Sequence, residues 1–210
     1  MTESGFVHRF VPGTSDRTLL VLHGTGGDEE QLIPLGRELD PVAAILSPRG
    51  KILEDGNARF FRRLAEGVFD LEDLKAQTDA LAAFVRAAAV RYQFDLEKTV
   101  AVGYSNGANI AASLLLRRPG VLSGAMLFRA MTPLIPDELP DLSGVDIWIA
   151  GGKQDTLIPR SGTEQLAEML SDAGAEVSAH FFDAGHELTN TELVLAKRWL
   201  DRRISSRLAR

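Results

Sequence analysis

One serine of the chain stands in a sequence pattern that fits a nucleophile. The segment Gly103-Tyr104-Ser105-Asn106-Gly107 has the form G-x-S-x-G, with an apolar run before it and an Ala/Leu-rich helical pattern after it. A sharp strand-to-helix turn of this kind exposes the central hydroxyl, and its two glycines avoid the clashes that a Cβ would create. The alternative is an ordinary glycine-rich turn in which Ser105 caps the following helix.

A serine nucleophile needs a general base, and the base needs a carboxylate that orients it. After a strand-turn-helix nucleophile, the acid comes first in the chain and the histidine second. Of the four histidines, only His180 and His186 lie well downstream of Ser105. His180 falls inside a predicted strand, whereas His186 lies in the loop after it and can be aimed across the sheet. We therefore predict His186 as the base; the alternative is a solvated loop histidine.

The acid is expected in the turn that follows another predicted strand. Asp155 is the only carboxylate in that turn, which spans residues 151–159. The alternative role for Asp155 is to bond the backbone of its own turn. Asp183 is closer to His186 in the sequence, but it comes at the end of its strand and is expected to point away. We predict Asp155 as the acid.

A glycine-rich loop, residues 24–28, follows the first predicted internal strand. It is not a dinucleotide fingerprint, because position 29 is a glutamate, and the chain contains no Gly-Lys-Ser/Thr triplet of a P-loop. Backbone N–H groups in such a loop and directly after the nucleophile form an oxyanion hole. We assign Thr25 and Asn106 to this role through their backbones, and we expect His23 to tether the loop.

Apolar runs alternate with helical periodicity along the whole chain. The strands predicted to be buried are residues 18–23, 42–47, 98–104, 124–128, 145–150 and 175–182, and residues 6–11 alternate as in an exposed edge strand. The predicted helices are residues 71–85 (with Asp70 as N-cap), 105–116, 163–170 and 192–208. This alternation predicts an α/β protein with a mostly parallel central sheet of about seven strands and helices on both faces. In such sheets, ligands bind at the carboxyl ends of the strands, where the candidate residues fall.

Length and composition limit the remaining options. The 210 residues suit one domain, residues 1–210. Acidic residues outnumber basic ones, 29 against 23, which argues against a nucleic-acid partner. The chain has no cysteine and only four histidines, so we expect neither a metal nor a cofactor, and the lack of cysteine fits a cytoplasmic location. No apolar run approaches the roughly 18 residues of a membrane span, and the N-terminus shows no secretory signal.

Together, these segments resemble the α/β-hydrolase superfamily and, within it, the small bacterial phospholipase/carboxylesterase family. The resemblance covers almost the whole chain and rests on residues 22–29, 59–63, 103–108, 150–155 and 185–186. The block Arg59-Phe60-Phe61-Arg62-Arg63 is similar to the branch of hydroquinone-associated hydrolases. Many acyl-thioesterase relatives have glutamine after the serine and then a Gly-Gly pair, whereas this chain has Asn106 and then Gly107-Ala108. The resemblance implies the α/β-hydrolase fold and a Ser-His-Asp triad.

The expected substrate groove is small. The interval from Phe128 to Val145 is too short for the cap domain of many larger α/β-hydrolases. Two residues of this interval and four apolar residues from other segments are expected to line an acyl or aryl groove; they are Met131 and Leu134, and Phe60, Phe61, Leu157 and Ile158. The alternative is that they only cover the sheet end. Arg62 and Arg129 are candidates for contact with an anionic substrate group, with surface ion pairs as the alternative.

These observations favour a serine carboxylesterase that hydrolyses a small-molecule ester through an acyl-enzyme, without a cofactor. A thioesterase or a lysophospholipase with the same triad is the alternative within this class. A ligand-binding or sensing protein with low turnover on the same scaffold is the alternative from another class. The sequence leaves the oligomeric state open, with a homodimer as one option.

Overall fold

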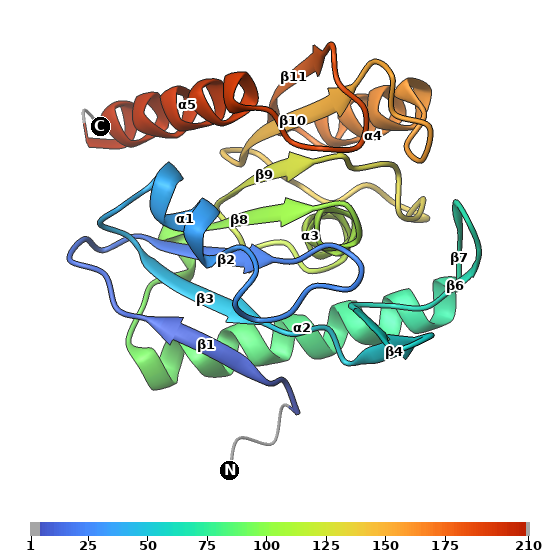
Figure 1. Cartoon of the computed structure of the whole chain (residues 1–210). Helices are drawn as coiled ribbons and strands as arrows, with labels where there is room; N and C mark the ends of the chain where they lie inside the picture. The colour runs from blue at the N-terminus through green and yellow to red at the C-terminus, as the bar shows by residue number, and fades with distance from the viewer. Residues whose placement is uncertain (1–4, 209–210) are drawn as a thin grey trace.

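A seven-stranded sheet forms the centre of the molecule (Figure 1). The computed structural model describes residues 5–208. The strands lie in the order β1-β3-β2-β8-β9-β10-β11, with bounds β1 His8–Val11, β2 Thr18–Leu22, β3 Ala44–Pro48, β8 Thr99–Tyr104, β9 Gly124–Phe128, β10 Asp146–Gly152 and β11 Glu176–Phe182. The edge strand β1 is antiparallel to β3, and every other neighbouring pair is parallel. The predicted, mostly parallel sheet of about seven strands is confirmed.

Helices cover both faces of this sheet, as predicted. Their bounds are α1 Ile33–Leu39, α2 Leu71–Tyr92, α3 Asn106–Arg117, α4 Arg160–Asp172 and α5 Asn190–Leu208. One core cluster packs α2, α3 and α4 against the sheet through residues such as Leu81, Leu114 and Leu166. The second cluster packs α1 and α5 on the opposite face, around Leu39, Trp148 and Leu200.

The local sequence explains most of these elements. All five residues of β2 are buried, because a strand covered on both faces needs no polar alternation. The helix α2 begins after Asp70, whose carboxylate accepts a hydrogen bond from the N–H of Asp73 at 3.1 Å, so the predicted N-cap is confirmed. It continues further than predicted, to Tyr92, and ends where Gln93 adopts a left-handed φ of 57°.

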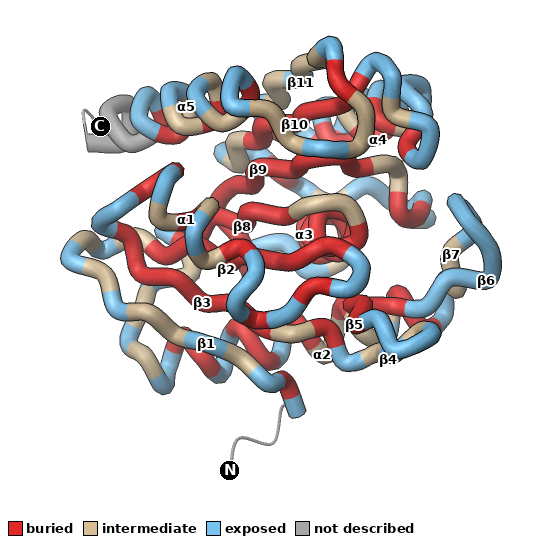
Figure 2. Tube along the Cα trace, in the orientation of Figure 1, coloured by how far each residue is buried: buried red, intermediate tan, exposed pale blue. Residues whose placement is uncertain are grey.

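Two hairpins between β3 and α2 were not predicted. The strand β4 (Ile52–Glu54) pairs with β5 (Asn57–Arg59), and β6 (Arg63–Ala65) pairs with β7 (Val68–Phe69). The Asp55-Gly56 turn has positive φ at both residues, 51° and 80°, which suits a tight hairpin. Strands of two or three residues are too short to show periodicity, and Figure 2 shows β6 exposed and β4 only partly buried at the periphery.

The structure differs from the prediction at two further elements, α1 and β11. The helix α1 was not predicted, because its seven residues are too few for an amphipathic repeat and include a proline in the first turn. The strand β11 was predicted as another buried strand, but it lies at the sheet edge and most of its residues are only partly buried. An edge strand has a neighbour on one side alone, which leaves its other side open.

The topology brings the candidate residues to one end of the sheet, where the parallel strands have their carboxyl ends. The loops after β2, β8, β10 and β11 all leave from this end, because these strands are parallel. Residues 129–145, between β9 and β10, contain no helix or strand, so no cap domain is inserted there. Within residues 5–208, no helix is long and apolar enough to cross a membrane.

The helix α2 provides a test of the core assignment. Leu81 is fully buried in α2, whereas Val90 of the same helix is 82% exposed. We expect Leu81→Ala to lower the free energy of unfolding by about 2–5 kcal/mol, because it removes buried methyl groups and leaves a cavity. The control Val90→Ala should change it by less than about 0.5 kcal/mol. Urea denaturation measures both, and equal effects would contradict the packing described here.

Candidate active site

Ser105 lies at the sharp turn between β8 and α3. Its φ of 53° is a left-handed value that non-glycine residues rarely adopt. A Cβ on Gly107 would lie 2.0 Å from the carbonyl oxygen of Leu22, so only glycine allows α3 to approach β2 this closely. The Ser105 side chain makes no capping hydrogen bond to α3, which excludes the helix-cap alternative. Ser105 lines a pocket instead.

His186 lies between Ser105 and Asp155. Its Nε2 is 2.9 Å from the hydroxyl oxygen of Ser105, and its Nδ1 is 2.8 Å from Oδ2 of Asp155. A carboxylate can only accept, so Nδ1 carries the proton and Nε2 is left to accept the hydroxyl proton of Ser105. The structure therefore brings together the three side chains that the chain order selected, at hydrogen-bond distances from one another.

The carboxylate of Asp155 is fully buried, and its two oxygens have different partners. Oδ2 faces His186, and Oδ1 accepts hydrogen bonds from the N–H groups of Leu157 and Ile158 at 2.9 and 3.0 Å. The turn bonding considered as an alternative from the sequence is therefore present. It orients the carboxylate toward the histidine and is compatible with the role of an acid in a triad.

The rival residues have other partners. The side chain of Asp183 is 79% exposed and pairs with Lys153 at 2.9 Å. His180 is partly buried in β11 with its ring 5.6 Å from that of Trp148. Burial lowers the pKa of His180. Both placements agree with the sequence-based preference for Asp155 and His186.

The glycine-rich loop after β2 is held by the second strand of the first hairpin. The N–H of Gly26 donates to the carbonyl of Ala58 at 2.9 Å, and Nη1 of Arg59 donates to the hydroxyl of Thr25 at 2.7 Å. Arg59 is nearly fully buried, which lowers its pKa, and Glu54 lies 3.3 Å from its Nε. The hairpin therefore determines where the backbone of Thr25 stands.

Asn106, the residue after the serine, is tied to the same segment. Its side-chain oxygen accepts a hydrogen bond from the N–H of Phe60 at 2.7 Å, and its side chain is buried. As the first residue of α3, it carries one of the N–H groups that have no acceptor within a helix. Thr25 and Asn106 both line the pocket beside Ser105.

His23 is a buried histidine with two backbone partners. Its Nδ1 lies 2.6 Å from the carbonyl of Gly24, and its Nε2 accepts from the N–H of Gly50 at 2.9 Å. Nδ1 therefore carries the proton, and the ring is neutral. Burial lowers the pKa of His23. These contacts place His23 as a tether between the glycine-rich loop after β2 and the loop after β3, as expected from the sequence.

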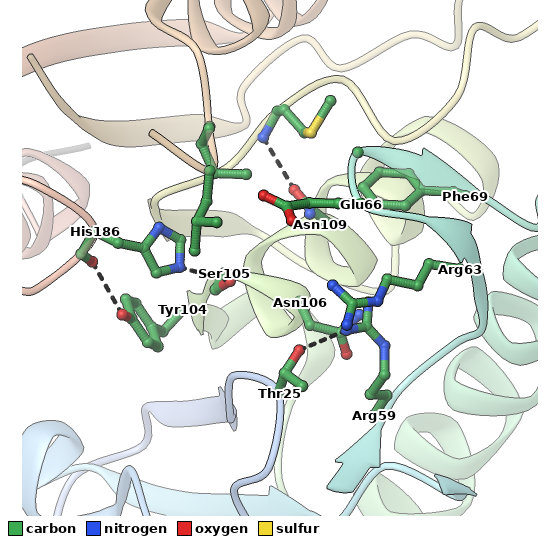
Figure 3. A pocket seen from close by; sticks show the side chains of 14 residues that line it. Thr25, Arg59, Arg63, Glu66, Phe69, Tyr104, Ser105, Asn106, Asn109 and His186 are labelled. Atoms are coloured by element: carbon green, nitrogen blue, oxygen red, sulfur yellow. Dashed lines mark hydrogen bonds between the residues drawn. The ribbon is translucent and has the colours of Figure 1, made fainter. Parts of the chain in front are cut away.

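A pocket of about 340 Å³ opens at Ser105 and His186. Figure 3 shows Arg59 and Arg63 across the pocket from His186. Apolar and polar side chains share the lining, which consists of Thr25, Arg59, Arg63, Glu66, Gly67, Phe69, Tyr104, Ser105, Asn106, Asn109, Met131, Leu157, Ile158 and His186. The expected lining residues Met131, Leu157 and Ile158 are therefore in place. The sequence did not predict the charged wall of the pocket, formed by Arg59, Arg63 and Glu66, although the Arg-Phe-Phe-Arg-Arg block was a signal for it.

Three expected lining residues belong to the core instead. Phe60 and Phe61 are 1% and 0% exposed, and Leu134 is 7% exposed. The ring of Phe60 packs 4.7 Å from that of His23, and the ring of Phe61 packs 5.0 Å from that of Phe69. Both aromatic rings therefore pack into the core and leave the pocket wall to other residues.

Neither arginine considered for an anionic substrate group lines the pocket. Arg62 is 60% exposed and pairs with Asp70 at 3.1 Å, which is the surface ion pair of the alternative. Arg129 fits neither expectation, because its side chain is completely buried and pairs with the equally buried Glu192 at 2.7 Å. Within residues 5–208, no group of three or more His, Cys, Asp or Glu side chains is arranged to hold a metal ion.

The parallel sheet, the strand-to-helix serine and the adjoining histidine–carboxylate pair define the class of protein: it is a hydrolase with the α/β-hydrolase fold. The chain belongs to the dienelactone hydrolase family, whose model matches residues 49–196. This family membership confirms the superfamily that the sequence blocks indicated.

Individual relatives agree with this assignment. The chain is 48% identical over 192 residues to the Bacillus subtilis (strain 168) protein named "Putative hydrolase MhqD", covering 91% of this chain and 96% of that one. A Bacillus cereus carboxylesterase structure matches with a TM-score of 0.93 and 44% identity over 96% of both chains. A carboxylesterase from Mesorhizobium loti matches with a TM-score of 0.88 and 34% identity over 96% of this chain and 97% of that one. These similarities support an ester-hydrolysing enzyme.

The neutral His23 makes stability depend on pH. Its pKa is below the ordinary 6.5 in the folded chain, so the unfolded chain binds a proton more readily. Stability is therefore fully present above pH 6.5 and falls as the pH drops below that value. We expect the loss of unfolding free energy between about pH 7 and pH 5 to be smaller in His23→Gln than in the unmodified protein. His180 contributes to both proteins, so their difference isolates His23; parallel curves would contradict this assignment.

Proposed function

We propose that this protein is a serine carboxylesterase in which Ser105, His186 and Asp155 form the catalytic triad. The observation that carries the proposal is the bridging position of His186, with 2.9 Å to the serine hydroxyl and 2.8 Å to the buried carboxylate. The carboxylesterases among the structural neighbours support the same reaction class.

In the proposed reaction, Oγ of Ser105 attacks the ester carbonyl carbon while Nε2 of His186 takes the hydroxyl proton. The backbone N–H groups of Thr25 and Asn106 stabilise the oxyanion of the tetrahedral intermediate. His186 then gives its proton to the leaving alcohol, and Asp155 stabilises the imidazolium and keeps its orientation. A water molecule, deprotonated by His186, then attacks the acyl-enzyme. This step releases the carboxylic acid product and restores the hydroxyl of Ser105.

The pocket points to a small ester as the substrate. Its volume of about 340 Å³ lies at the lower end of the range for small-molecule sites. The side chains of Phe69, Met131, Leu157 and Ile158 provide apolar contact beside the serine. A short acyl or aryl ester fits this size and this lining.

The nucleophile is tested with p-nitrophenyl esters of increasing acyl length. We expect Ser105→Ala to lower kcat by about 10⁴- to 10⁶-fold, as in other enzymes that lose a triad serine. The control is Ser171→Ala, which removes an exposed hydroxyl bonded only within α4 and should leave turnover unchanged. A fluorophosphonate label located by mass spectrometry should fall on Ser105. A folded protein without turnover or labelling would refute the proposal.

The acid is tested by two matched substitutions. We expect Asp155→Asn to lower kcat by about 10⁴-fold, because the amide no longer favours the tautomer that leaves Nε2 free to accept. Asp183→Asn removes the exposed rival and its pair with Lys153, and it should leave kcat within about twofold. Steady-state kinetics on the same aryl ester measures both. A large loss in Asp183→Asn instead would reassign the acid.

Related assays test the alternative functions that the sequence analysis left open. Parallel kcat/KM values on an aryl ester and on an acyl-CoA decide between ester and thioester hydrolysis, since the triad serves both. A ligand that raises Tm, combined with an unchanged background rate in Ser105→Ala, would indicate a binding protein instead of an enzyme.

A further inference from the structure

Arg129 follows directly after β9, next to the proposed active site, and is the largest charged group of the buried core. Its backbone has a left-handed φ of 57°, and its N–H donates to the carbonyl of Ala150 in β10 at 2.8 Å. This conformation costs a non-glycine residue about 1 kcal/mol or more, so it persists only where the surroundings enforce it. The side chain is directed toward the loop that carries His186.

The guanidinium of Arg129 binds the backbone on both sides of His186. Its Nε donates to the carbonyl of Gly185 at 2.9 Å, and its Nη2 donates to the carbonyl of Glu187. The carbonyl of His186 itself accepts a hydrogen bond from the hydroxyl of Tyr104 at 2.9 Å. Three consecutive carbonyls of the loop are therefore held by two side chains, which leaves this backbone little freedom to move the imidazole.

The same guanidinium is also close to the carboxylate of the proposed acid. Nε of Arg129 lies 3.9 Å from Oδ2 of Asp155, the oxygen that faces Nδ1 of His186. Nη2 pairs with Glu192 at 2.7 Å, and all three charged side chains are fully buried. Attraction between opposite charges is strong in such a low-dielectric setting, so the cation helps to hold the carboxylate in place.

We infer that Arg129 is a positioning residue that sets the orientation of His186 relative to Ser105 and Asp155. It does not touch the substrate pocket; it acts through the backbone of residues 185–187 and through the carboxylate of Asp155. The inference rests on the proposed function, in which His186 is the base. It goes beyond the triad by assigning a role to a residue that binds none of the reacting atoms.

The kinetic test uses Arg129→Lys. Lysine keeps the positive charge opposite Glu192, but its single ammonium group cannot reproduce the planar fork that spans both carbonyls. We expect kcat on a p-nitrophenyl ester to fall by about 10- to 100-fold, because small misplacements of a catalytic group have effects of this size. KM should change by less than about threefold, since the substrate contacts remain. A kcat within twofold of the unmodified enzyme would overturn the inference.

The chain offers a matched control at the opposite end of the sheet, where β9 and β10 begin. Arg203 on α5 is also a buried arginine, with its Nε 2.5 Å from Asp146 at the start of β10 and its Nη2 donating to the carbonyl of Ser123 just before β9. Arg203→Lys disturbs a comparable ion pair far from the triad edge. It should lower Tm as much as Arg129→Lys does, but leave kcat unchanged. Equal losses of kcat in both variants would assign Arg129 a role in stability alone.

A second variant allows for the cost of an unpaired buried charge. Removing Arg129 alone leaves Glu192 buried without its partner, which destabilises proteins strongly. The double variant Arg129→Met with Glu192→Gln removes both charges and retains similar side-chain volumes. We expect it to fold and to show a loss of kcat at least as large as that of Arg129→Lys. Turnover like that of the unmodified enzyme in this folded variant would overturn the inference.

A measurement without substrate separates this inference from the proposed function. The proton on Nδ1 of His186, bonded to Asp155, should give a downfield NMR signal that Ser105→Ala retains. We expect Arg129→Lys to shift or broaden this signal and Arg203→Lys to leave it unchanged. An unchanged signal in Arg129→Lys would refute positioning, whatever the enzyme hydrolyses. If the unmodified enzyme lacked esterase activity, the proposed function would fail while the signal still reported the geometry.

Discussion

The hydrogen bond between Ser105 and His186 joins two groups that are 81 residues apart in the chain. It forms only if β8 and β11 deliver their following loops to the same edge of the sheet, with β9 and β10 between them at the observed register. The glycines around Ser105 serve this requirement, because any side chain at Gly107 would push α3 away from the carbonyl of Leu22. The parallel sheet is thus the device that converts sequence separation into contact.

Burial shapes the electrostatics of this edge. Asp155, Arg129 and Glu192 are all withdrawn from water, and each has at least one oppositely charged partner within 4 Å. Isolated charges at these depths would be strongly unfavourable, so the group is stable only as an ensemble of pairs and hydrogen bonds. His23 follows the opposite rule: it is buried neutral, and its two backbone partners are those of an uncharged ring.

The sequence alone predicted the sheet and the candidate triad for identifiable physical reasons. Strands such as β2 and β9 are continuous apolar runs, and chain order together with the carboxyl-edge rule selected Ser105, Asp155 and His186. The hairpins β4–β5 and β6–β7 were not predicted, because their strands are too short to show a periodic pattern. Arg59 and Arg63 lie in these hairpins, so their position in the pocket wall was not predicted either. The side-chain directions of Phe60 and Phe61 also depend on neighbours distant in the chain.

Arg129 shows the same limit from another side. A single arginine after a buried strand reads as a surface residue, because nothing near it in the sequence announces burial. Its carboxylate partner, Glu192, arrives 63 residues later on α5. Only the folded arrangement of β9, β10 and α5 brings the two together.

The division between the sheet edge and the two hairpins has an evolutionary consequence. The candidate reacting groups stand on loops anchored by the central strands, whereas part of the wall opposite His186 belongs to the second hairpin, β6–β7, at the margin of the fold. The tip of the second hairpin, Glu66-Gly67, and its exposed neighbours Leu64 and Val68 bear little of the core. Descendant sequences can therefore remodel the tip of the second hairpin and acquire new ligand preferences, while the first hairpin keeps its hydrogen bonds to the loop of Thr25.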